Sequence, residues 1–160
     1  MRNNFGFTLI ELLVIVAILA VLSSIATPAF LQWRSDAKLR DAVSSLRGDL
    51  EMAKLRAMKE NEFVAVLFNT NNYLVFIDDG TGAGGVAENW NRDGDEKILR
   101  NRQLPAGVHI DSGSTTFASN RTRFNGRGRV GNQGVVTIVN KAGDQKIIDM
   151  NNRFGRITVN

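Results

Sequence analysis

The chain of 160 residues contains no cysteine, one histidine and two prolines. Without cysteine, disulfide bonds and thiolate chemistry are excluded, so the fold does not depend on the redox state of its compartment. The single histidine, His109, lies in a short apolar stretch and is expected to be structural or exposed. No Ser-His-Asp set, no phosphate-binding glycine loop and no paired-histidine metal site is present in the sequence. The sequence therefore predicts a protein that is not an enzyme and has no catalytic residue.

Charge is present but unevenly distributed. The formal net charge is +4, yet residues 121–160 carry eight Lys and Arg against two Asp and Glu, a net +6. Residues 1–120 carry twelve against fourteen, a net −2. Within that part, residues 78–96 hold six acids and only one base, Arg92. A basic C-terminal quarter and an acidic loop are separate features that each need an explanation.

The longest apolar segment lies close to the amino end. Residues 12–22 are apolar without interruption, and the segment from Phe7 to Ala26 has 20 residues. As a helix it would span about 30 Å, the thickness of the hydrocarbon core of a bilayer. Arg2 precedes it and no acid does, so the amino end is expected to stay cytoplasmic while the remainder crosses outward.

Three interpretations of this segment compete. A secretory signal would use a small-residue cleavage site, for which residues 24–26 are available, but Pro28 follows closely and the apolar run is long. A plain signal anchor fits the length but leaves Glu11 unexplained. A carboxylate inside a membrane helix costs about 2.5–3.5 kcal/mol on insertion scales and usually has a functional partner.

The third interpretation accounts for both Gly6 and Glu11. Gly6, the following string FTLIELLV and the later Pro28 resemble the type IV pilin and type II secretion pseudopilin superfamily. The resemblance implies that prepilin peptidase cuts between Gly6 and Phe7 and methylates the new amine of Phe7. It also implies an assembly role for Glu11, whose buried carboxylate would pair with the amine of a neighbouring subunit.

Beyond the anchor the sequence predicts a helix and then a sheet. Pro28 should kink the helix or let it melt locally. A stripe of apolar or small residues at spacings of three and four indicates an amphipathic helix to about Met58. That stripe comprises Phe30, Trp33, Ala37, Val43, Leu46, Leu50, Ala53 and Ala57. Strands are expected at 63–68, 73–77, 98–104, 108–110, 122–124, 135–139, 146–150 and 156–159.

The short connections favour antiparallel pairing. The fold class expected is therefore α+β and pilin-like, with a long N-terminal helix packed on an antiparallel β-sheet domain. The expected organisation is a leader at 1–6, a membrane and assembly helix at 7–28, and a globular domain at 29–160. The helix of that domain would cover 29–58 and its sheet 63–160.

Two C-terminal strings narrow the resemblance. RFNGRG at 123–128 is similar to a turn of the H-type pseudopilins and FimT/FimU-like minor pilins, and NRFGRI at 152–157 to their terminal Gly-Arg strand. FimT-like minor pilins are thought to capture DNA through a Gly-Arg-x-Arg motif. Here Thr158 stands at the place of the second arginine, which weakens that implication.

Cations alternate along the same part of the chain, and an extended strand would project them on one side. Together with nearby aromatic residues they could bind a nucleic-acid backbone without sequence preference. The alternative is a solvated face, or one that docks on an acidic neighbouring subunit. The DNA-binding candidates are Arg121, Arg123, Arg127, Arg129 and Arg156.

The acidic loop suggests a cation, although no cofactor is otherwise expected. Carboxylates among glycines offer the hard oxygen ligands that calcium prefers, but their spacing matches no full calcium motif. A flexible, solvated loop is the favoured alternative. The calcium candidates are Asp78, Asp79, Asp93 and Asp95.

These features predict a minor pilin or pseudopilin, a subunit of a type IV pilus or of a type II secretion pseudopilus. The alternative is a DNA-binding minor pilin acting in DNA uptake. The expected partners are other pilins or pseudopilins, prepilin peptidase, inner-membrane lipid before assembly, and DNA under the alternative. The expected location is the bacterial inner membrane, with the globular domain in the periplasm, and afterwards a filament.

Overall fold

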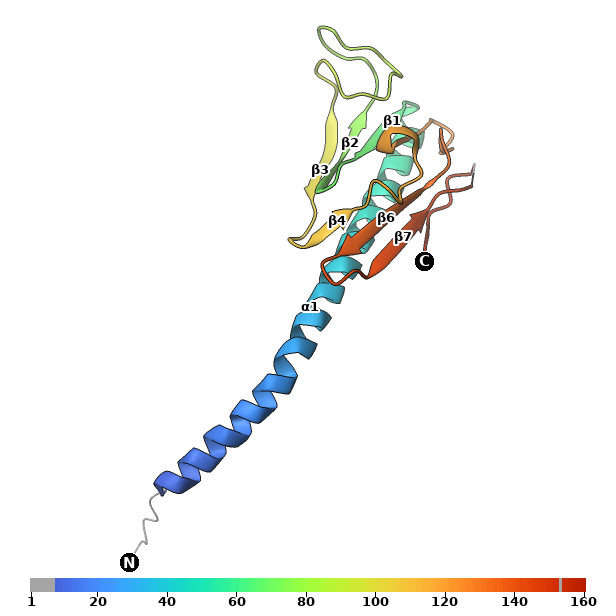
Figure 1. Cartoon of the computed structure of the whole chain (residues 1–160). Helices are drawn as coiled ribbons and strands as arrows, with labels where there is room; N and C mark the ends of the chain where they lie inside the picture. Colours follow the sequence, from blue (N-terminus) through green and yellow to red (C-terminus); the bar gives the residue numbers. More distant parts are fainter. Residues whose placement is uncertain (1–7, 153) are drawn as a thin grey trace, which may run out of the picture. The chain divides into compact units, whose positions relative to one another are not determined.

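A computed structural model describes residues 8–152 and 154–160, and the chain separates into two compact units, 1–34 and 35–160 (Figure 1). In these described residues the regular structure consists of one long helix, one 3₁₀ turn and eight short strands. The elements are α1 (Leu9–Glu60), β1 (Val64–Phe68), β2 (Asn72–Ile77), β3 (Ile98–Gln103), β4 (Val108–Ile110), the 3₁₀ turn η1 (Ala118–Asn120), β5 (Arg121–Phe124), β6 (Val135–Asn140), β7 (Gln145–Asp149) and β8 (Thr158–Val159).

Helix α1 ends at Glu60, and the backbone conformation of the next residue explains why. Asn61 has a left-handed φ of 56°, and the amide of Glu62 donates to the carbonyl of Ala57 at 3.3 Å. Asparagine is one of the few side chains that tolerate this conformation after a helix. The helix therefore extends two residues beyond the expected end at Met58.

The second half of α1 supplies one wall of the hydrophobic core. Five members of the expected stripe are buried, namely Val43, Leu46, Leu50, Ala53 and Ala57. The stripe begins at Leu39, however, and not at Phe30. Phe30 and Trp33 are exposed and pack on each other with ring centroids 5.9 Å apart. Inclusion of these two aromatics in the buried stripe was wrong, because periodicity cannot tell where the partner surface of a helix begins.

The strands pair antiparallel, as expected, and they form two four-stranded sheets. The strand orders are β3-β2-β1-β5 and β4-β6-β7-β8. The β1–β2 hairpin closes through the expected turn, where the amide of Asn69 donates to the carbonyl of Asn72 at 2.9 Å. Figure 1 shows both sheets beside the second half of α1. Their buried side chains, with those of the helix, form one core that runs from Leu39 to Ile157.

One buried carboxylate ties α1 to the first sheet. Asp49 is only 6% exposed and accepts hydrogen bonds from the hydroxyl of Tyr73 at 2.7 Å and from Nε of Arg102 at 2.9 Å. Burial, followed by the hydrogen bond to Asp49, raises the pKa of Tyr73, so its hydroxyl remains a donor. A buried charge is tolerable only when it is paired and hydrogen-bonded, and these contacts meet both conditions.

We expect Asp49→Ala to destabilise unit 35–160 by about 3 kcal/mol, because it leaves the Tyr73 hydroxyl buried without an acceptor. The measurement is urea unfolding of that unit, whose core lies entirely within its own residues. Asp41→Ala, at an exposed position of the same helix, is the matched control and should change stability by less than about 0.5 kcal/mol. Equal effects of the two substitutions would contradict the role of Asp49.

Candidate functional site

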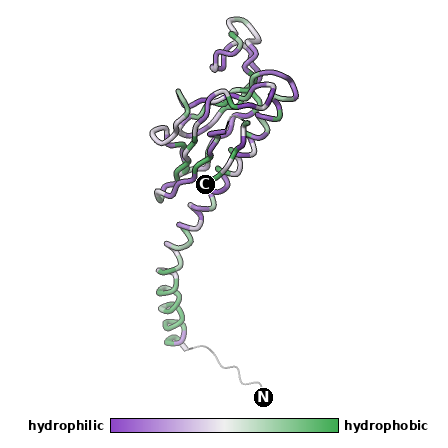
Figure 2. The backbone as a smooth tube through the Cα atoms, turned by 90° about the vertical axis from the view of Figure 1, so that its right-hand side faces the viewer, coloured by the Kyte–Doolittle hydropathy of each residue, from purple (hydrophilic) through white to green (hydrophobic). Residues whose placement is uncertain are grey.

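The first half of α1 carries an apolar surface that the other described residues of its unit leave exposed. Every large hydrophobic side chain described between Leu9 and Trp33 is exposed. Figure 2 shows the hydrophobic colour concentrated along this half of the helix. Among the described residues α1 is the one helix long and apolar enough to cross a membrane. A helix that is apolar all round requires lipid or other helices as its surroundings.

Glu11 lies in the first turn of this segment and forms a capping box. Its Oε2 accepts hydrogen bonds from the backbone amide and the hydroxyl of Thr8, both at 2.9 Å, while the Thr8 hydroxyl accepts from the amide of Glu11 at 3.3 Å. This reciprocal pair satisfies amides at the start of the helix. For the other oxygen, Oε1, no hydrogen bond is found among residues 8–152 and 154–160. Glu11 thus has a local role and still offers one acceptor.

Thr8 is a residue whose role the sequence analysis missed. The spacing of a threonine three residues before a glutamate, followed by an apolar run, is a signature of a helix start and would have identified it. Gly6 and Phe7, where cleavage and methylation are expected, lie outside the described residues.

Pro28 lies within the continuous helix. The residues on either side of it remain helical, so the helix does not melt at this point. The hydroxyl of Thr27 donates to the carbonyl of Ser23 at 2.7 Å in the turn that precedes the proline. A kink at Pro28 stays a prediction.

The acidic loop between β2 and β3 uses its carboxylates to hold its own backbone. Asp78 is 1% exposed and accepts from the amides of Asn89 at 3.3 Å and Trp90 at 3.0 Å. Glu96, also buried, accepts from the amides of Gly80 at 3.0 Å and Asp93 at 3.1 Å. Burial raises the pKa of Asp78 against the opposing effect of these hydrogen bonds. The loop is therefore built around buried carboxylates.

The calcium candidates are not gathered into a site. Asp79 accepts from the amide of Thr81 at 3.0 Å, Asp93 accepts from the amide of Val86 at 3.0 Å, and Asp95 is exposed. Within residues 8–152 and 154–160 no three Asp, Glu or His side chains come together as a metal-binding group. Calcium binding stays a prediction that this geometry does not support.

Two of the expected DNA-binding arginines hold the acidic loop on β5. The guanidinium of Arg123 lies between the rings of Phe63 and Trp90, 4.1 and 4.2 Å from their centroids, and donates to the carbonyl of Glu88 at 3.1 Å. Its side chain is 15% exposed and lies 3.8 Å from the carboxylate of Asp78. Arg121 donates to the carbonyl of Trp90 at 3.1 Å. In this position Arg123 of β5 holds the acidic loop in place.

The expectation that four arginines project from one extended strand was wrong. Strand β5 ends at Phe124, and the chain turns back so that Val130 bridges to Phe124. The side chain of Asn125 directs this turn by accepting from the amides of Arg127 and Arg129, both at 3.0 Å. Turn chemistry of this Asn-Gly kind ends an extended segment, which the alternation of arginines alone did not reveal.

The turn brings together two basic strings that are distant in the sequence. Gly155 packs so closely on Gly128 that a side chain there would collide with the carbonyl oxygen of Gly128. Lys54 of α1 donates to the carbonyls of Phe154 at 3.3 Å and Gly155 at 2.9 Å, which fixes the terminal segment beside the turn. The arginines at this meeting point, Arg127, Arg129 and Arg156, are exposed.

Two protein-family models match this chain, one over its N-terminal apolar segment and one over its globular part. Residues 1–27 match the prokaryotic N-terminal methylation motif, and residues 42–153 match the model described as type II transport protein GspH. A fimbrial protein of Pseudomonas aeruginosa is 29% identical over 124 residues, which cover 74% of this chain and 80% of that protein. The type IV major pilin protein PilA of Myxococcus xanthus is 43% identical over 45 residues, 28% of this chain and 20% of PilA.

Solved structures share the fold. The type IV minor pilin FimU of P. aeruginosa superposes with a TM-score of 0.57 at 14% identity, over 80% of this chain and 92% of FimU. The minor pseudopilin EpsH from the type 2 secretion system of Vibrio cholerae gives a TM-score of 0.57 at 15% identity, over 77% of this chain and 96% of EpsH. The expected superfamily and fold class are confirmed, and the chain belongs to the GspH family of type IV pilin-like and pseudopilin subunits.

Proposed function

We propose that this chain is a processed subunit of a type IV pilus or type II secretion pseudopilus, assembled through the first half of α1. The observation that carries the proposal is the apolar surface between Leu9 and Trp33, interrupted by the single carboxylate of Glu11. Before assembly lipid of the inner membrane covers this surface, with the folded unit on the periplasmic side. In the filament the anchors of other pilins replace the lipid. The role is structural, and no catalytic step is involved.

Processing is the first step of the proposed pathway. Prepilin peptidase removes residues 1–6 and methylates the new amine of Phe7. This amine is then a cation at the start of the apolar segment. The match of residues 1–27 to the methylation motif supports this step. In assembly the positively charged amine of an incoming subunit pairs with the negatively charged Glu11 of a neighbour. This ion pair stabilises both charges among apolar side chains, which would solvate neither charge alone.

Gly6→Leu should block cleavage, because a bulky side chain replaces the smallest residue beside the bond that is cut. Intact-mass measurement of the chain from its host should then show the six-residue leader retained and Phe7 unmethylated. Asn4→Leu, within the same leader, is the control and should mature normally. A Gly6→Leu chain with the mature mass would contradict the cleavage site.

Glu11 can be tested so that its two roles separate. Glu11→Gln keeps an acceptor for the capping box and removes the charge, whereas Glu11→Ala removes both. If the charge guides assembly, both variants should insert into the membrane, and both should lower incorporation into filaments by about tenfold or more. The measurement is the ratio of chain in the sheared filament fraction to chain in the membrane fraction.

Glu62→Gln, at an exposed position outside the anchor, is the control for this experiment and should assemble normally. A Glu11→Gln chain that assembles like the unchanged protein would reduce Glu11 to a helix-capping residue. Intact masses of all variants show whether processing has remained normal.

A DNA-binding role is a second candidate, and it rests on the meeting of the two basic strings at Gly128 and Gly155. The exposed arginines of these two strings, Arg127, Arg129 and Arg156, are cations that can contact a phosphate backbone. The proposed site is therefore smaller than the sequence indicated, since Arg121 and Arg123 are committed to the acidic loop.

Under this candidate function the unit 35–160 should bind DNA with an affinity that falls as salt rises. Changing Arg127, Arg129 and Arg156 together to Gln should reduce the slope of log affinity against log salt by about 2–3. The matched control changes the same number of exposed cations elsewhere, Arg40, Arg47 and Lys146, and should leave most of the binding intact. Absence of binding at low salt, or equal loss in both triple variants, would refute the assignment.

A further inference from the structure

A groove of about 310 Å³ lies between one face of α1 and the strands β7 and β8. Helix positions 40, 43, 44 and 47 line it from one side, at spacings that place side chains on one face of a helix. Lys146 of β7 and Val159 of β8 line it from the other side. All of these residues belong to unit 35–160, so the groove is separate from the anchor.

The groove combines cations with an apolar lining. Arg40, Arg47 and Lys146 are exposed, and no acid lines the groove. Within residues 8–152 and 154–160 no ion pair joins these three cations to an acid. Water can solvate them, but three like charges around one hollow create a positive potential that attracts an anion.

The apolar lining restricts what that anion can be. Val159 is half-buried and Val43 lies beside it in the lining, and the aliphatic stems of the long cations add to the apolar surface. A phosphate backbone would use the cations and leave this surface in contact with water. A matching partner therefore carries negative charge beside an exposed apolar side chain.

The acidic loop of the same chain has this combination. Val86 is its one exposed large hydrophobic side chain, at 56% exposure. Glu88 and Asp95 are exposed, and for neither carboxylate is a hydrogen bond found among the described residues. Asp79 is a third exposed acid, against one exposed base, Arg92. The loop thus complements the groove in both charge and polarity.

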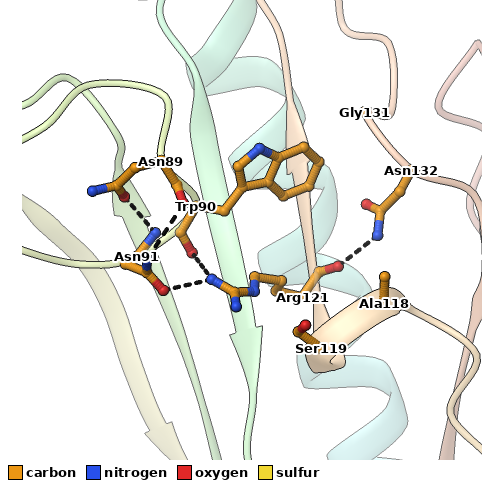
Figure 3. A pocket seen from close by; sticks show the side chains of 8 residues that line it. All are labelled: Asn89, Trp90, Asn91, Ala118, Ser119, Arg121, Gly131 and Asn132. Carbon is orange, nitrogen blue, oxygen red and sulfur yellow. Dashed lines mark hydrogen bonds between the residues drawn. The ribbon is translucent and has the colours of Figure 1, made fainter.

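Hydrogen bonds hold the loop in shape before any partner binds. Arg121 of β5 donates to the carbonyl of Trp90 and to the side chain of Asn91, as Figure 3 shows. The amide of Val86 donates to the carboxylate of Asp93 at 3.0 Å, which fixes the backbone of the exposed valine. A surface that is already ordered loses little conformational entropy when it docks.

We propose that the groove binds the acidic loop of a second copy of this chain, with Val86 against Val159 and the exposed acids among the three cations. Figure 1 shows the loop beyond the ends of β2 and β3, away from β7, so groove and loop are different surfaces of unit 35–160. A contact between two different surfaces is heterologous, and each copy can use both surfaces at once. Such contacts build helical chains or rings of subunits, in addition to the packing of anchors in the proposed filament.

The test uses introduced cysteines, because the chain has none of its own. Ser44→Cys lies in the groove and Ala87→Cys lies next to Val86, both at exposed positions. The two full-length variants are produced together and oxidised in the membrane of the host, where confinement raises their effective concentration. Mass spectrometry of the linked peptides then measures how often positions 44 and 87 are joined.

A matched control replaces Ser44→Cys by Ala142→Cys, which is exposed elsewhere in the same unit. A disulfide requires Cα atoms within about 7 Å, so the link between positions 44 and 87 should exceed the link between 142 and 87 by about fivefold or more.

Charge reversal tests whether the cations of the groove recognise the loop. The groove-reversed variant carries Arg40→Glu, Arg47→Glu and Lys146→Glu. It should lower the link between positions 44 and 87 about tenfold, because acids then face acids. Its control has the same change of net charge outside the groove, should keep the link, and carries Arg127→Glu, Arg129→Glu and Arg156→Glu.

A reversed loop in the second chain, Glu88→Lys with Asp95→Lys, should restore the link to the groove-reversed variant without raising the link between 142 and 87. Equal links from positions 44 and 142, equal effects of groove reversal and its control, or no recovery with the reversed loop would overturn the proposal. An anionic lipid or a nucleic acid as the occupant of the groove would give these negative results. Glu11→Gln should leave the link in the membrane unchanged, so failure of this contact is distinguishable from failure of anchor-driven assembly.

Discussion

A single helix that must satisfy two different surroundings is the constraint on which this structure depends. From Leu9 to Trp33 its side chains are apolar on every face and exposed, whereas from Leu39 onward only one stripe is apolar and that stripe is buried. The first pattern is stable only among lipids or other helices, and the second only against a folded domain. Under the proposed function, membrane storage and filament assembly use the same surface, since lipid tails and neighbouring apolar helices both cover it without solvating a charge.

The globular unit is organised around carboxylates that have been removed from water. Asp49 joins α1 to β2 and β3, and Asp78 and Glu96 fold the acidic loop around their oxygens. Each accepts at least two hydrogen bonds, which is the condition under which a buried acid is tolerated. Because the geometry of such a network is specific, the acidic loop has a defined shape despite its glycines.

The sequence was most informative where the pattern is local. All eight strands were predicted to within about two residues, since alternation of apolar side chains and the turn residues between them are short-range signals. It was least informative about contacts across the chain. Nothing in the spacing of Arg123 indicated that it would lie between Phe63 and Trp90, and nothing marked Phe30 as lying outside the buried stripe. The partition of the strands into two sheets likewise depends on long-range pairing that periodicity does not encode.

Contacts between distant parts of the chain also change the interpretation of its charged residues. In the sequence, the basic quarter and the acidic loop are two features that each suggest a ligand of opposite charge. In the structure, Arg121 and Arg123 serve as donors to the loop, and Asp78 and Glu96 serve as acceptors for its amides. The two features therefore partly satisfy each other, and a count of charges overstates what remains for an external partner. What remains exposed of the DNA-binding candidates is narrower: Arg127, Arg129 and Arg156, next to the contact between Gly128 and Gly155.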